Sequence, residues 1–307
     1  MDMRQIRYFS VVVGSGSISK AARQLGMTQP PLSASIAQLE KEAGVRLLER
    51  TAQGVEPTPA GIYLAAAGDR MLREFAQITA DLQSIGQGLL GQLNLAAVLP
   101  FSWAYLPPLL HSFSEIAPRV DVNLNDPAPD VVLDGLINGT LDIGIMATSD
   151  SDRLQTMYSA QLHVSRISEM PLAAILPPRF ASLPGPIDLR DLAGERWMLP
   201  SQTPRFLGLP DLVQELWFEN GMTPPTLKLI PNLQTALPLI AADMGVSVMP
   251  EAVAEMAQTV VITRRIRQRV PPLQIAMVWS KTRQPTEVTE RFLATAIAGT
   301  PSALGSL

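Results

Sequence analysis

The sequence contains no cysteine and only two histidines, His111 and His163, in 307 residues. The absence of cysteine excludes disulfides, thiolate nucleophiles and cysteine-ligated zinc, and it is typical of a cytoplasmic protein. The sequence also lacks a G-x-S-x-G nucleophile motif, a glycine-rich phosphate loop and any metal-ligand spacing. His111 falls in an apolar-periodic helix, where a polar surface position is expected rather than catalysis. We therefore predict no catalytic residue, no metal and no cofactor, and a protein that is not an enzyme.

Long hydrophobic runs are also missing, although 47% of the residues are apolar. No stretch approaches the roughly 20 uninterrupted apolar residues that a membrane-spanning helix needs. Residues 1–5 include an acid and lead into no apolar run, so no secretory signal is visible. We expect a protein that stays in the cytoplasm, has no membrane partner and folds into two or three compact units.

An excess of positive charge, which many nucleic-acid-binding proteins have, is absent as well, because the net charge is −4. The charge is unevenly distributed, however. Residues 1–58 carry seven basic and five acidic side chains, which gives a net charge of +2 there and −6 in the remainder. This asymmetry permits a DNA-binding N-terminal part without establishing one.

Residues 17–36 predict a helix, a tight turn and a second helix. Gly26 can adopt the positive φ that such a turn needs, and Pro30 fits the first turn of the second helix, where a missing N–H costs little. Residues 43–57 follow as a short two-stranded wing that turns near Gly54. Together these segments predict a winged helix-turn-helix.

Residues 59–86 predict a long helix with an apolar seam. Its apolar residues are separated by steps of seven, four, three, four and three, as in the a and d positions of a coiled coil, and Gly68 fills the skipped position. A single solvated helix does not need such a seam, whereas a pair of helices does. We interpret this segment as a dimerisation helix that ends in a hinge at residues 86–88. The predicted contacts are Leu64, Met71, Phe75, Ile78, Leu82 and Ile85.

From Gly91 onward, short apolar strands alternate with helical patterns, which favours parallel sheets covered by helices on both faces. The predicted strands are 93–98, 120–124, 143–146, 172–176, 197–199, 227–230, 246–249, 260–263 and 273–279. The predicted helices lie near 103–116, 130–138, 205–220, 232–243 and 286–298.

Several sequence motifs occur here in a fixed order. A pair of alanines, a Thr-Gln-Pro-x-Leu-Ser run, an isoleucine and a Leu-Glu pair appear as Ala21-Ala22, Thr28-Gln29-Pro30-Pro31-Leu32-Ser33, Ile36 and Leu39-Glu40. Further matching motifs are Leu106-Pro107, 139–144, 191–195, 234–236 and 245–250. In these motifs the chain resembles the LysR-type transcriptional regulators along its whole length.

The resemblance implies an α+β multidomain fold. Residues 1–58 would form the winged helix-turn-helix DNA-binding domain, and residues 59–88 the linker helix and hinge. Residues 89–307 would form an effector-binding domain similar to periplasmic binding proteins. Its first α/β subdomain would comprise 89–164 and 266–307, and its second 165–265.

The resemblance further implies that a recognition helix, about residues 28–39, lies in the major groove of double-stranded DNA. Gln29 would face base edges, since glutamine can pair with adenine. The DNA-binding residues implied in this way are Lys20, Arg23, Thr28, Gln29, Pro30, Ser33, Arg50 and Thr51. An ordinary exposed helix surface is the alternative for Gln29 and Ser33. The sequence departs from many relatives at Ala34 and at 52–54, where they carry basic residues, so fewer phosphate contacts are expected.

A small-molecule effector would bind between the two α/β subdomains, in contact with three loops. The implied residues are Pro100, Phe101, Ser102, Pro129, Ser201, Gln202, Thr203, Arg205 and Phe206. Two of them, Pro100 and Pro129, offer neither an N–H nor a hydroxyl, which puts a simple dicarboxylate in doubt. Arg205 either binds an anionic group bidentately or is a surface arginine at a helix start.

The resemblance also implies a homodimer and, through further contacts, a homotetramer, with RNA polymerase as another candidate partner. Effector binding would then change the spacing of the DNA-binding heads and the bending of DNA. Two alternatives are an enzyme and a solute-binding protein. An enzyme lacks support from any catalytic motif, and a solute-binding protein would not explain residues 1–86.

Overall fold

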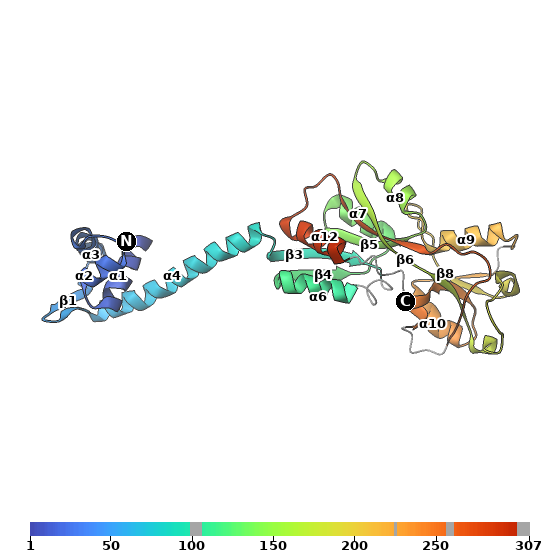
Figure 1. Ribbon diagram of the computed structural model, residues 1–307, viewed down its shortest axis with the longest axis horizontal. Helices are drawn as coiled ribbons and strands as arrows, with labels where there is room; N and C mark the ends of the chain where they lie inside the picture. The colour runs from blue at the N-terminus through green and yellow to red at the C-terminus, as the bar shows by residue number, and fades with distance from the viewer. Residues whose placement is uncertain (99–105, 224–225, 256–260, 300–307) are drawn as a thin grey trace. The chain divides into compact units, whose positions relative to one another are not determined.

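The computed structural model describes residues 1–98, 106–223, 226–255 and 261–299 (Figure 1). It divides into two compact units, residues 1–84 and 85–307. This division is coarser than the predicted one into 1–58, 59–88 and 89–307, which stays a prediction. Within the described ranges, no helix has the length and apolar character needed to cross a membrane.

The first unit has the predicted winged helix-turn-helix and the long helix that follows it. Its elements are α1 (Met3–Ser15), α2 (Ile18–Gln24), α3 (Gln29–Ala43), β1 (Leu48–Thr51), β2 (Gly54–Pro57) and α4 (Pro59–Gly86). Local signals set the helix ends. Asp2 forms a capping box with Gln5 at the start of α1, Gly16 ends that helix at φ 62°, and Ser17 caps α2.

The three-helix head packs around a small apolar core. Phe9 and Leu32 are fully buried, and Ala21 and Ala22 leave room for the helices to approach closely. Gly26 has the predicted positive φ, +67°, in the turn between α2 and α3. The head is therefore organised by the residues that the sequence pattern had indicated.

The beginning of α4 is fastened to the head. Thr58 donates a hydrogen bond from its hydroxyl to the Arg46 carbonyl oxygen (2.8 Å) and accepts one from the Gly61 N–H (3.0 Å). Leu64 packs against the head core, and a Cβ on Gly68 would lie 2.6 Å from Ile6 Cγ2. The interpretation of Gly68 as a seam position is therefore wrong, because this buried glycine lets α4 pass close to α1 of the same chain.

The second unit contains a five-stranded sheet in the order β4-β3-β5-β12-β6. Its strands are β3 (Leu90–Ala97), β4 (Arg119–Asn125), β5 (Ile143–Thr148), β6 (Leu162–Met170) and β12 (Leu273–Ser280). Helices α6 (Leu106–Ile116), α7 (Pro129–Asn138), α8 (Ser151–Met157) and α12 (Glu287–Gly299) accompany it. Alternate strand residues face opposite sides. Ile275 and Met277 pack with α6 and α12, whereas Ala276 and Val278 pack with α7.

Another group of strands follows β6 in the chain. It comprises β7 (Leu172–Leu176), β8 (Trp197–Pro200), β9 (Leu227–Ile230), β10 (Ser247–Pro250) and β11 (Ile262–Arg264). The order β10-β7-β11 is antiparallel, β8 and β9 are parallel, and a bridge from Trp197 to Val246 joins the two groups. The accompanying helices are α9 (Leu209–Glu219), α10 (Leu233–Ala241), α11 (Glu251–Glu255) and the 3-10 turns Pro178–Phe180 and Leu189–Leu192.

The prediction of parallel sheets is wrong for several strand pairs. β12 is antiparallel to both of its neighbours, β5 and β6, and β7 is antiparallel to both of its neighbours. Strand β6 and the short helices α8 and α11 were not predicted, because polar residues interrupt β6 and seven or five residues are too few for a helical pattern. The predicted starts at 103 and 260 lie outside the described residues.

The predicted helix 205–220 starts late, at Leu209. The Gly208 N–H donates to the Asp211 carboxylate (2.8 Å), so Gly208 is the cap of this helix. Before it, the Phe206 N–H bonds to the Thr203 carbonyl oxygen (3.0 Å) and forms a separate turn.

The fastening of α4 can be tested with Gly61→Ala. The added Cβ would overlap the Leu47 carbonyl oxygen, whereas Gly14, also helical, has nothing within 4 Å. We expect Gly61→Ala to lower the free energy of unfolding of the head by about 1–3 kcal/mol, as overpacking does. Hydrogen–deuterium exchange of the head amides measures this change. Gly14→Ala is the matched control, and equal protection in the two variants would contradict the packing described.

Candidate functional site

The start of α3 is an exposed polar tip on the first unit. Thr28 is the N-cap residue, but its side chain makes no capping hydrogen bond, and prolines occupy the next turn. Thr28, Gln29 and Pro30 are exposed and Ser33 is half-buried. The Ser19 hydroxyl donates to the Gln29 side-chain oxygen (2.8 Å), which ties α2 to this tip. A hydroxyl and an amide are thus presented to solvent at the beginning of the helix.

Basic side chains lie on the elements next to this tip. Lys20 and Arg23 are on α2, and Arg50 is on β1 with Thr51; all four are exposed. Within the part of the chain that the structure describes, none of the three basic groups has an ion-pair partner. Unpaired exposed cations are what a phosphate backbone requires.

Glu40 holds the wing in place. Its carboxylate oxygen Oε1 accepts hydrogen bonds from the backbone N–H groups of Leu47 (2.7 Å) and Leu48 (3.0 Å), where β1 begins. The Val55 N–H on β2 bonds to the Gly16 carbonyl oxygen (3.0 Å), which joins the wing to the α1–α2 turn. From the sequence, Glu40 was recognisable only as part of the Leu39-Glu40 motif. Its contacts show why an acid stands there.

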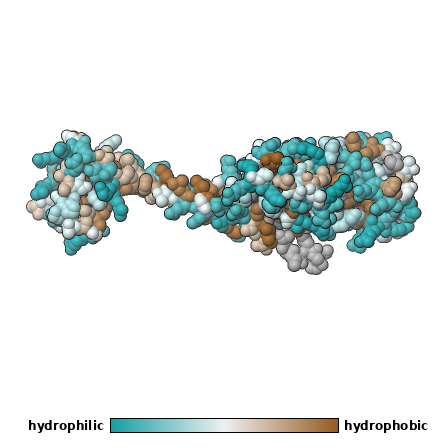
Figure 2. Space-filling model, turned by 90° about the horizontal axis from the view of Figure 1, so that it is seen from above, coloured by the Kyte–Doolittle hydropathy of each residue, from teal (hydrophilic) through white to brown (hydrophobic). Residues whose placement is uncertain are grey.

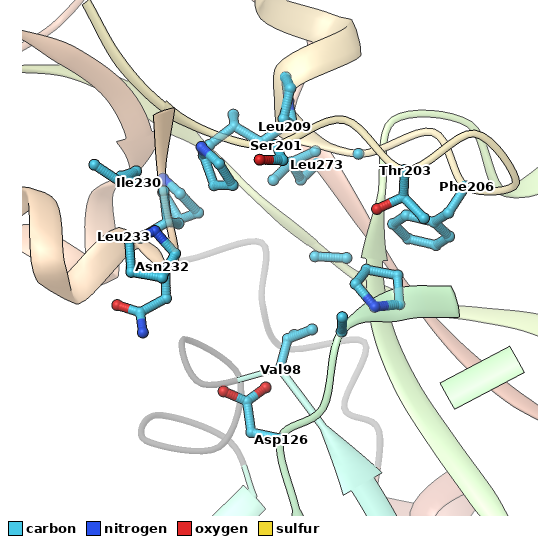
Figure 3. Close-up of a pocket in the computed structure, with 18 of the residues that line it drawn as sticks. Val98, Asp126, Ser201, Thr203, Phe206, Leu209, Ile230, Asn232, Leu233 and Leu273 are labelled. Atoms are coloured by element: carbon cyan, nitrogen blue, oxygen red, sulfur yellow. The ribbon is translucent and has the colours of Figure 1, made fainter. Parts of the chain in front are cut away.

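The second unit contains a cleft of about 420 Å³ (Figure 3). The loops after β4, β8 and β9 contribute to its wall, as does the end of β10. Met170, the last residue of β6, and Leu273, the first residue of β12, also line it. Among the predicted effector-binding residues, Pro129, Ser201, Thr203 and Phe206 line it. The predicted residues Pro100, Phe101 and Ser102 lie outside the described residues.

Two predicted effector-binding residues, Gln202 and Arg205, do not line the cleft. The Gln202 amide donates to Asp211 (2.9 Å) and Gln214 (3.2 Å). Arg205 forms two parallel hydrogen bonds with the Asp134 carboxylate on α7 (2.9 and 2.8 Å), and these bonds lower the pKa of Asp134. Arg205 therefore does bind a carboxylate bidentately, but that carboxylate belongs to the protein.

Several cleft residues were missed by sequence reasoning. They include Asp126, Ile230, Asn232, Leu233, Pro250 and Leu273. Most of them follow the carboxyl end of a strand, where α/β proteins bind ligands, so the strand predictions already contained this signal. Asp126 is accessible to solvent, yet the surrounding protein raises the pKa of its carboxyl group by desolvation.

Comparison with known proteins decides which family has this combination of head and cleft. Residues 3–62 match the bacterial regulatory helix-turn-helix protein, lysR family, and residues 86–300 match the LysR substrate binding domain. The chain belongs to the LysR family. It is a DNA-binding transcriptional regulator with an effector-binding domain, not an enzyme. The prediction from the sequence motifs is confirmed.

Two curated relatives of similar length are transcriptional regulators. The chain is 30% identical to the probable cat1 operon transcriptional activator of Acinetobacter lwoffii, covering 85% of this chain and 84% of the relative. It is 28% identical to the HTH-type transcriptional regulator XapR of Escherichia coli, covering 95% and 96%. The full-length structure of CbnR in complex with its target DNA is similar, at 25% identity and a TM-score of 0.81, covering 98% of this chain and 100% of that one.

The exposed tip of α3 leads to a prediction about base reading. Gln29→Ala removes the amide, and since a good bidentate pair contributes about 1–3 kcal/mol to base discrimination, we expect a roughly tenfold or greater loss of operator affinity. Affinity for random DNA should stay nearly unchanged. Fluorescence anisotropy with both DNAs measures the two effects. Gln38→Ala, nine residues further along α3, is the control, and equal losses on both DNAs would show that Gln29 reads no base.

Proposed function

We propose that the chain binds operator DNA by inserting the start of α3 into the major groove. The observation that carries this proposal is the exposure of Thr28, Gln29 and Pro30 at the tip of a helix whose opposite face is buried in the head core. Ser33 would contact the same DNA. Lys20, Arg23, Arg50 and Thr51 would hold the sugar-phosphate backbone and set the register. The complex of the similar protein CbnR with its target DNA supports a role of this kind.

The proposal includes dimerisation through α4. Beyond Gly68, this helix exposes large apolar side chains at helical spacing, which Figure 2 shows in brown. Phe75 is 61% exposed and Leu82 is 65% exposed, and both lie on the stripe that also contains Met71, Ile78 and Ile85. An isolated amphipathic helix gains little stability in water, so a second copy of α4 is the natural cover for this stripe. Leu64, by contrast, is already half-covered by the head.

Control by a small-molecule effector completes the proposed function. The effector would occupy the cleft lined by Pro129, Ser201, Thr203 and Phe206. Four heads of a homotetramer would bind adjacent DNA sites in the cytoplasm, and cleft occupancy would shift the equilibrium between two spacings of these heads. DNA bending, and contact with RNA polymerase, would change as a result. Identical DNA bending with and without a ligand that binds the cleft, measured by gel mobility, would contradict this mechanism.

The stripe on α4 gives a direct test. Phe75→Asp together with Leu82→Asp places charges in the seam, so we expect monomers by light scattering. Operator affinity should then fall by a factor of about 100 or more, because the two heads no longer bind as one unit. Gln77→Asp together with Gln83→Asp adds the same charge on another face of α4 and should leave the dimer intact. A double seam variant that stays oligomeric would show that α4 is not the dimer contact.

A further inference from the structure

The charged side chains that the described residues bring to the cleft are acidic. Among the described residues that line it, Asp126 and Asp211 are the only ionisable side chains, and none is basic. Asp211 is already engaged, because it accepts hydrogen bonds from the Gly208 N–H (2.8 Å) and the Gln202 amide (2.9 Å). Asp126 accepts no hydrogen bond and forms no ion pair with any described residue. Asp126 and Asn232 both line the cleft, and Figure 3 shows them from the loop after β4 and the loop after β9.

Among the described residues, the helix starts at the cleft offer few free backbone N–H groups to an anion. Pro129 starts α7, Pro210 lies in the first turn of α9, and Pro250 precedes α11, so three positions lack an N–H. The first turns of the same helices contain the acids Asp130, Asp211 and Glu251, which occupy the positive end of each helix dipole.

In the fourth helix at the cleft, α10, the N-cap side chain binds groups of its own helix. The Asn232 side-chain oxygen accepts hydrogen bonds from the Thr235 N–H (3.0 Å) and hydroxyl (2.9 Å). In α11 the Glu251 N–H bonds to the Pro171 carbonyl oxygen (3.0 Å). Helix N-termini bind carboxylates and phosphates when their N–H groups are free. At this cleft, many of those N–H groups are not free. Prolines lack the N–H, and other N–H groups already donate to side chains or to main-chain carbonyl oxygens.

The rest of the described wall is mostly apolar, with hydroxyls at Ser201 and Thr203 and a side-chain amide at Gln234. Val98, Phe206, Leu209, Ile230, Leu233 and Leu273 surround the space, and Ser201 and Thr203 add hydroxyl groups on the side away from Asp126 (Figure 3). Such a lining fits an apolar body of small-molecule size.

We propose that the cleft binds a small molecule with an apolar body and a positively charged amine, with Asp126 as the counter-ion of that amine. This inference rests on the proposed function of the cleft as the effector site and names the class of its ligand. An ammonium group would supply the ionic partner that the Asp126 carboxylate does not find among the described residues. It would also offset the desolvation that raises the pKa of Asp126 in the free protein. A carboxylate ligand would instead face an unpaired negative charge.

The test uses three probes of one shape that differ in charge: para-fluorobenzylamine, para-fluorobenzyl alcohol and para-fluorobenzoate. Fluorine NMR titrations of the full chain at neutral pH give their dissociation constants. We expect the amine to bind at least about tenfold more tightly than the benzoate, because the Asp126 carboxylate attracts the ammonium group and repels the carboxylate. Asp126→Asn should bring the amine to the level of the alcohol.

Asp152→Asn is the control, because it removes the same charge from the exposed start of α8, outside the cleft. It should leave the preference for the amine unchanged, and circular dichroism should show both variants folded. Tighter binding of the benzoate, no preference for the amine, or a preference that survives in Asp126→Asn would each overturn the proposal.

A second readout separates this proposal from the proposed function. Operator affinity is measured by anisotropy with each probe at saturation. Amine binding that depends on Asp126 but leaves operator affinity and DNA bending unchanged would support the ligand class and contradict regulation through the cleft. Benzoate that binds more tightly than the amine and changes operator affinity would contradict the proposed ligand class and support regulation through the cleft.

Discussion

The pairing of β6 with β12 is the constraint on which the second unit depends. The two strands run antiparallel from Leu162 opposite Ser280 to Met170 opposite Leu273, with one irregularity near Ile275. At the Met170–Leu273 end the chain passes from the five-stranded sheet to the strands that begin with β7. Both residues of this last pair are almost fully buried, and both line the cleft. The cleft therefore lies where this shared pair of strands leaves one sheet and enters the other.

The segment before α9 shows how closely the two sides of the cleft are linked. The Leu207 carbonyl oxygen accepts a hydrogen bond from the Thr148 hydroxyl (2.8 Å) and one from the Ser149 N–H (2.9 Å). The Tyr158 hydroxyl donates to the Arg205 carbonyl oxygen (3.1 Å), and Phe206 packs among residues of the five-stranded sheet. This segment belongs in sequence to one group of strands and in packing to the other, so its contacts join both sides of the cleft.

The head was predictable because its signals are local. Gly16, Gly26 and Pro30 act through the backbone angles of a few neighbouring residues, and the buried Phe9 and Leu32 follow helical spacing. The fold class followed from these signals together with the family motifs. The register of α4 was harder. Its apolar spacing is continuous, so nothing in the pattern separates Gly68, which packs on Ile6, from the exposed stripe beyond it.

The cleft was predictable only in part, because its partners are far apart in the sequence. Arg205 pairs with Asp134, 71 positions away, and no local sequence pattern predicts such a pair. Strand β6 alternates irregularly between polar and apolar residues, so its place beside β12 comes from tertiary pairing and not from propensity. Ile230 and Pro250 lie at or next to the ends of strands that were predicted from the sequence. The rule that α/β proteins bind ligands at the carboxyl ends of strands would have included both residues in the predicted site.

Recognition of a specific DNA sequence through the head is the function on which the other proposals for this LysR-family chain depend. The most direct measurement is fluorescence anisotropy of the full chain with its own upstream intergenic DNA and with a scrambled DNA, over a series of salt concentrations. We expect tighter binding to the upstream DNA at every salt concentration. We also expect both affinities to fall as salt rises, because phosphate contacts release counterions. Equal affinity for the two DNAs throughout the series would contradict recognition of a specific sequence.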